Sequence, residues 1–86
     1  MSDRENHDQS TRRFIELANE MMHEGLDRQL VSAALMAASG IFLTFTAAGN
    51  AGALNSSGVD KAVSQFRRNL EHIQDLKKRE LGGVTE

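Results

Sequence analysis

Residues 30–48 have the sequence LVSAALMAASGIFLTFTAA, and this stretch decides the fold of the chain. It is the centre of a longer segment, Gln29 to Val59, that carries no charged residue, although charged residues are dense on both sides of that segment. A helix that is apolar on nearly every side is buried on more than one side or embedded in a membrane. The first question is therefore whether the chain is a soluble helical protein or a membrane protein.

The length and hydropathy of residues 30–48 suit a membrane span, but their composition favours a soluble protein. The stretch is close to the ~20 residues that a span needs, and its mean hydropathy is roughly 1.8. Alanine supplies much of it, however, and alanine contributes little transfer free energy because it buries little area. The flanks, Asp27-Arg28 and Asp60-Lys61, hold no excess of positive charge, and the chain has no Trp or Tyr for an interfacial belt. We expect a buried helix of a soluble bundle, with membrane association through residues 30–48 as the alternative.

The composition of the whole chain predicts an all-α protein. Its 86 residues suffice for one domain with a modest core. The chain has no Pro, is rich in good helix formers, and shows no run of alternating apolar and polar residues that would indicate a strand. It has no Cys, and its N-terminal segment lacks the basic and then apolar layout of a signal peptide, so we expect a cytoplasmic protein. The formal net charge of −2 gives no general attraction to nucleic acid.

The spacing of apolar residues predicts a three-helix bundle or helical hairpin, with helices over residues of about 11–24, 28–47 and 58–81. Ser10 or Thr11 would cap the first helix, and Gly25 would end it. Asp27 would cap the second helix. Residues 1–9 are polar and mixed in charge, which predicts a disordered tail. A single helical domain would then span residues 10–81, and residues 82–86 would form a flexible C-terminus after the Gly82-Gly83 pair.

The second predicted helix has more apolar surface than two short neighbours can cover, and this excess predicts self-association as a homodimer. The third predicted helix carries one apolar stripe and a charged opposite face. The four Phe residues all fall on apolar stripes, and the favoured interpretation is that they lie in the core. The alternative is that Phe42 and Phe45 anchor a subunit contact, because aromatic side chains dominate such contacts. The full set of residues expected at this interface, or at the interface with another protein, is Met22, Ala37, Ile41, Phe42, Phe45 and Asn19.

The sequence shows no arrangement of residues that is typical of catalysis. Glu20 and His23 have the Glu-x-x-His spacing of di-iron carboxylate bundles, but the phase of the first helix places both off its apolar face. A solvated surface is therefore the favoured interpretation, and a weak metal-binding bundle is an alternative. No Ser lies at a suggestive spacing from a His, and the glycine-rich segment Gly49 to Gly58 lacks the Lys-Ser/Thr of a phosphate loop. We expect no enzyme and no cofactor.

Three segments resemble a family of short bacterial proteins of unknown function. They are Phe14-Ile-Glu-Leu-Ala-Asn19, then Val31-Ser-Ala-Ala-Leu-Met-Ala-Ala38, then the amphipathic helix around Phe66. The family shows a Phe-x-x-x-Ala-Asn opening and an Ala-rich second helix, and the resemblance covers most of residues 11–76. It implies a small soluble helical protein without a catalytic residue. An ordinary surface position is the favoured interpretation of Asn19, and a contact to the backbone of a loop or a partner is the alternative. Together with the residues, it predicts an adaptor or regulator that binds itself and an unidentified protein.

Overall fold

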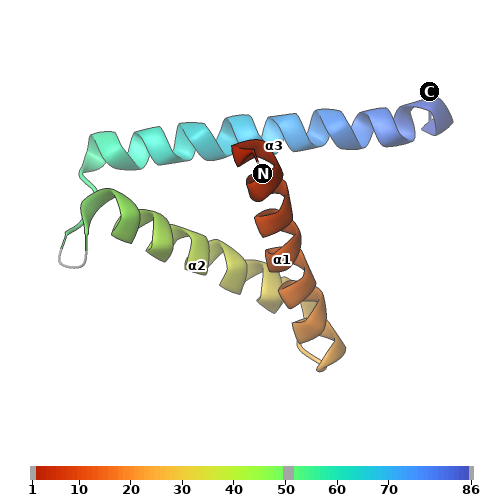
Figure 1. The fold of residues 1–86 in the computed structure, drawn as a ribbon, viewed down its shortest axis with the longest axis horizontal. Helices are drawn as coiled ribbons and strands as arrows, with labels where there is room; N and C mark the ends of the chain where they lie inside the picture. Colours follow the sequence, from red (N-terminus) through yellow and green to blue (C-terminus); the bar gives the residue numbers. More distant parts are fainter. Residues whose placement is uncertain (1, 50–51, 86) are drawn as a thin grey trace. The chain divides into compact units, whose positions relative to one another are not determined.

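The protein is all-α, as predicted, and three helices make up most of it. The computed structural model describes residues 2–49 and 52–85, and within these ranges it contains no strand. The helices are α1 (Asp3–His23), α2 (Arg28–Ala48) and α3 (Ser56–Thr85) (Figure 1). The chain divides into two compact units, Met1–Thr46 and Ala47–Glu86. The first unit therefore holds α1 and nearly all of α2, and the second holds α3.

The turn between α1 and α2 is built by Gly25 and Asp27, as the sequence predicts. Gly25 has a φ of 103°, a left-handed conformation that favours glycine after the last turn of a helix. Its N–H donates to the carbonyl of Met22 at 3.0 Å, and the N–H of Leu26 donates to the carbonyl of Met21 at 3.2 Å, which is the hydrogen-bond pattern of a Schellman motif. The Asp27 carboxylate then accepts from the N–H of Gln29 at 3.0 Å and so caps α2.

Helix α1 begins earlier than the sequence predicts, because a cap lies upstream of the predicted one. The Ser2 hydroxyl accepts from the N–H of Glu5 at 3.1 Å, and the Glu5 carboxylate accepts from the N–H of Ser2 at 3.1 Å. This reciprocal pair is a capping box, which satisfies two N–H groups that lack partners inside the helix. Residues 3–9, which the sequence placed in a disordered tail, belong to α1. Thr11 does not cap the helix but donates its hydroxyl to the His7 carbonyl at 2.9 Å.

Both limits of α3 also differ from the prediction. The N-cap is Asn55, whose side-chain oxygen accepts from the N–H of Gly58 at 2.7 Å. The helix then continues through Gly82 and Gly83 to Thr85, beyond the predicted end at Leu81. Glycine inside a helix costs only about 1 kcal/mol relative to alanine, so a glycine pair weakens a helix without having to end it. Of the predicted flexible C-terminus, residues 82–85 are helical, and Glu86 lies outside the described residues.

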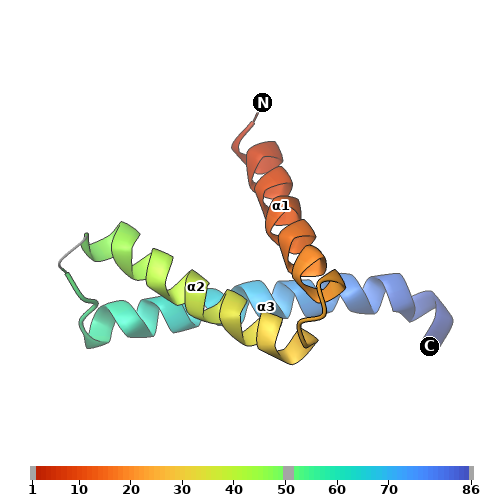
Figure 2. The same cartoon turned by 90° about the horizontal axis from the view of Figure 1, so that it is seen from below.

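Helix α2 is continuous through Gly40. The sequence alone does not predict whether the helix is interrupted there. Helices α1 and α2 lie close together near the turn that joins them and diverge away from it (Figures 1 and 2). Val31, in the first turn of α2, is 5% exposed and is the one buried side chain among the described residues. The core of the first unit is thus confined to the neighbourhood of the turn.

A candidate interaction surface on α2

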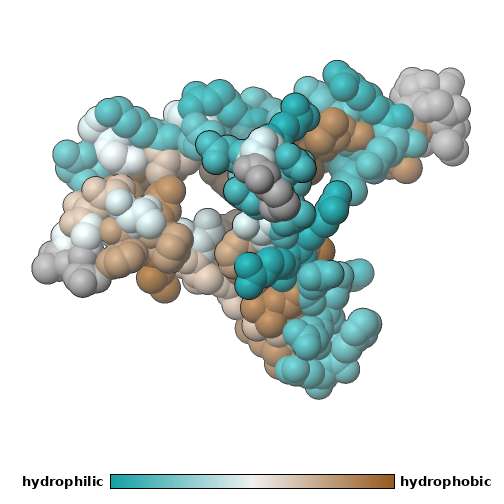
Figure 3. All heavy atoms as spheres, in the orientation of Figure 1, coloured by the Kyte–Doolittle hydropathy of each residue, from teal (hydrophilic) through white to brown (hydrophobic). Residues whose placement is uncertain are grey.

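The exposed apolar residues of α2 form the most conspicuous surface of the first unit. Beyond Val31, every large apolar side chain of the helix is exposed, because α1 diverges from α2 and covers only its first turns. Figure 3 shows that the α2 region carries mostly brown and pale side chains with little teal. The residues that we call the α2 apolar surface are Leu30, Leu35, Met36, Ile41, Phe42, Leu43 and Phe45.

Phe42 and Phe45 form an aromatic pair in the C-terminal half of this surface. Their ring centroids lie 6.1 Å apart, and the ring planes are inclined at 46°. Phe42 is 66% exposed and Phe45 is 47% exposed, and Ile41 beside them is 73% exposed. An aromatic side chain buries about 150–250 Å² of surface when it is covered, which is among the largest areas for any residue type. Burial of this cluster against another surface would therefore be favourable.

The polar groups near the aromatic pair are already satisfied within the helix. The Thr44 hydroxyl donates to the Gly40 carbonyl at 2.8 Å, and the Thr46 hydroxyl donates to the Leu43 carbonyl at 3.0 Å. Burying an unpaired hydroxyl costs free energy, whereas a hydroxyl with an internal partner can be buried with little penalty. The hydrogen bonds of Thr44 and Thr46 thus make the C-terminal half of α2 easier to bury.

The structure places the six residues predicted for the interface on two helices. Ala37, Ile41, Phe42 and Phe45 are all exposed on α2. Asn19 and Met22 are exposed on α1, and Met22 is 37% exposed whereas its neighbour Met21 is half-buried. Because Met22 lies beside the turn and Phe45 lies near the far end of α2, an interface with all six residues would have to run along most of α2.

Four residues of the α2 apolar surface are not among the residues predicted for the interface: Leu30, Leu35, Met36 and Leu43. By helix phase, Leu30 and Leu35 share a wide apolar stripe with Phe42 and Phe45, whereas Met36 and Leu43 lie on the opposite, nearly as apolar side. The sequence does contain a signal for these residues, because apolar side chains occur on every side of α2. The exposure of Leu35 follows from the divergence of α1, which the sequence pattern does not encode.

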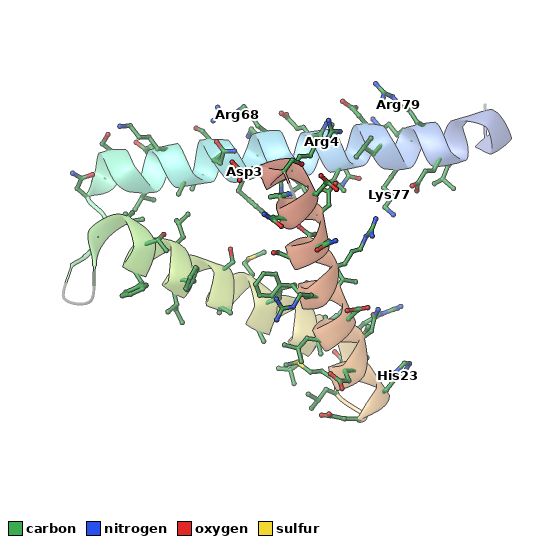
Figure 4. All side chains as sticks on the ribbon, in the orientation of Figure 1. Asp3, Arg4, His23, Arg68, Lys77 and Arg79 are labelled. Atoms are coloured by element: carbon green, nitrogen blue, oxygen red, sulfur yellow. The ribbon has the colours of Figure 1, made fainter. Side chains whose placement is uncertain are left out.

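The possible metal ligands on α1 remain on its surface. Glu20 and His23 are exposed, and Figure 4 shows His23 at the C-terminal end of the helix with its side chain directed away from it. Within residues 2–49 and 52–85, no three His, Asp or Glu side chains are grouped so that they could hold a metal ion. The pair of Glu20 and His23 alone would leave most positions around a metal to other ligands.

Two basic residues of α3 form ion pairs with acidic residues of the same helix. Arg67 lies 3.9 Å from the Glu71 carboxylate, and Lys77 lies 3.6 Å from the Glu80 carboxylate. In Figure 4, Arg68 and Arg79 point to one side of α3, whereas Lys77 points to the other side. Interleaved acids and a divided distribution of basic side chains do not make the single basic face that typically binds nucleic acid.

Helix α2 also satisfies the length and composition criteria for a membrane span. Its 21 residues, Arg28–Ala48, contain a window with a mean hydropathy of 1.8, of which 6% is buried. The core helix of a soluble protein can have the same composition, but such a helix is mostly buried by its own protein. Within the first unit, α1 covers only the first turns of α2, so most of the α2 apolar surface is exposed in that unit.

Comparison with known protein families gives one match. Residues 9–76 match the family model described as "Protein of unknown function (DUF3144)". The matched range begins within α1, contains all of α2, and ends within α3 at Leu76. This match agrees with the resemblance to a family of unknown function, whereas the Phe-x-x-x-Ala-Asn opening and the bacterial origin stay predictions. Neither the curated proteins nor the solved structures include a match to the chain.

Proposed function

The chain belongs to the DUF3144 family of proteins of unknown function, and we propose that it acts by protein–protein interaction, as a homodimer joined through the α2 apolar surface. The observation that carries this proposal is the exposure of Ile41, Phe42 and Phe45 on a helix without a charged side chain beyond Arg28. Contiguous apolar patches on a soluble protein mark sites where another molecule binds. The proposed role is that of an adaptor or regulator, which binds an unidentified protein as well as a second copy of itself.

The free energy available from covering this surface supports self-association. Burial of apolar area contributes about 25 cal/mol per Å², so the side chains of Phe42, Phe45 and Ile41 would together contribute several kcal/mol. Part of this gain is offset by the loss of translational and rotational freedom when two chains associate. If the interface included the rest of the α2 apolar surface, the free energy gained on burial would exceed this entropic cost by more than if only the aromatic pair were buried.

A second copy of α2 is the occupant that best matches the surface in chemistry and length. Covering α2 with a charged segment would remove charges from water without supplying partners, which is costly. Gln29 to Val59 has no charge, so two copies of this segment can meet without that penalty. A dimer with twofold symmetry uses the same patch on both subunits, and a patch of uncharged apolar side chains is complementary to itself.

The proposal includes a non-catalytic role in the cytoplasm, without a cofactor, a nucleic-acid partner or a membrane. The sequence has no reactive Ser–His or Cys–His arrangement, which supports a non-catalytic role. The net charge of −2 and the local pairing of Arg67 and Lys77 on α3 support the absence of nucleic-acid binding. The many charged residues outside Gln29 to Val59 favour solubility once the α2 apolar surface is covered.

The mass of the protein in detergent-free buffer tests this proposal. Light scattering after size exclusion should give a discrete mass near twice the 9.5 kDa of the chain. The concentration should be measured by refractive index, because the chain has no Trp or Tyr that absorbs at 280 nm. A clean monomer over the range from micromolar to millimolar concentration would contradict the homodimer and would mean that the chain's own helices cover α2.

A second candidate is membrane association through α2, and two observations favour it. Helix α2 has 21 residues, which at 1.5 Å per residue gives roughly the ~30 Å of a hydrocarbon core. The Thr44 and Thr46 hydroxyls have partners within the helix, as groups exposed to lipid require. We rank this candidate second because the flanks carry no positive excess and the chain has no Trp or Tyr. Flotation with lipid vesicles separates the two, since the homodimer should stay in the aqueous fraction whereas a membrane protein should float with the lipid.

A further inference from the structure

No further inference is drawn: the strongest candidate, the exposed apolar stripe of α3 formed by Val59, Val63, Phe66, Leu70 and Ile73, carries nothing, because nothing in the structure shows what covers it.

Discussion

Phe42 and Phe45 contact each other on the surface of α2, with ring centroids 6.1 Å apart, although both rings are largely exposed. Tilted aromatic pairs at this separation are favourable by about 0.5–1.5 kcal/mol beyond the area that they bury. Aromatic side chains also contribute most of the binding energy in many interfaces. For this reason we place the centre of the proposed interface at the aromatic pair.

The substitution Phe42→Asp should break the homodimer and leave a helical monomer. It places a charge at the centre of the proposed interface, where burial without a partner costs several kcal/mol, whereas the exposed position tolerates the charge in a monomer. The mass from light scattering should fall to that of one chain, and circular dichroism should still show a helical protein.

The variant Gln29→Asp is the matched control for this substitution. It adds the same charge to the same helix at a polar, exposed position next to the N-terminus of α2, where an acid is favourable. This control should remain a dimer. If the Phe42→Asp protein is still dimeric and still helical, the aromatic pair is not part of the interface.

The substitution Gly25→Ala should destabilise the protein by about 1 kcal/mol or more, because alanine is disfavoured at a positive φ. Gly25 has a φ of 103°, and no atom lies near the position of an added methyl group, so the cost would come from the backbone alone. Gly40→Ala is the comparison, since Gly40 lies inside α2 and is also open to an added methyl group.

Gly40→Ala should raise the stability by up to about 1 kcal/mol, because alanine has the higher helix propensity. Chemical unfolding followed by circular dichroism measures both substitutions. By helix phase Gly40 lies away from Phe42 and Phe45, so the Gly40→Ala protein should keep the mass of the unchanged protein. A loss of dimer in this variant would instead place the interface at the small residues around Gly40.

The substitution Ser2→Ala should loosen the first turns of α1 without a measurable change in global stability. It removes the capping box with Glu5, but residues 3–13 contain no apolar side chain that could anchor this part of α1 to a core. Hydrogen exchange should become faster at the first turns of α1 only, and the free energy of unfolding should change by less than about 0.5 kcal/mol.

Asp27→Ala serves as the contrast to Ser2→Ala, because the Asp27 cap lies at the compact turn between α1 and α2. Its loss should lower the free energy of unfolding by about 1 kcal/mol. An equal loss of stability for Ser2→Ala would show that the N-terminal turns of α1 contact the rest of the protein.

The substitution Val31→Ala should destabilise the first unit by on the order of 1–2 kcal/mol, because it removes buried methyl groups and leaves a cavity. Val31 is the buried side chain of the described part of the chain, and Val63 on α3 is an exposed valine that serves as the control. Val63→Ala should have a clearly smaller effect on the thermal midpoint. Equal effects would indicate that the α3 stripe is covered in solution.

Much of the secondary structure could be predicted because it depends on neighbours in the sequence. The Gly25 turn and the Asp27 cap are formed by residues within one helical turn of each other, so their residue types alone point to the structure. The early start of α1 was missed because the Ser2–Glu5 capping box precedes a polar segment, and helix prediction relied on apolar spacing. The candidate site stays a prediction, and what the structure adds is that Phe42, Phe45, Leu35 and Met36 are all exposed on α2.

The sequence by itself determined that the chain forms three helices, where the charge-free helix lies, and which of its side chains share a side. These properties follow from local hydrogen bonding and from the period of 3.6 residues per turn. Only the tertiary structure decided that Val31 is buried whereas Phe42 and Phe45 are exposed. Burial depends on the path of a neighbouring helix, and α1 diverges from α2 beyond the turn that joins them. Periodicity gives the direction of a side chain from its helix, but it does not specify what lies in that direction.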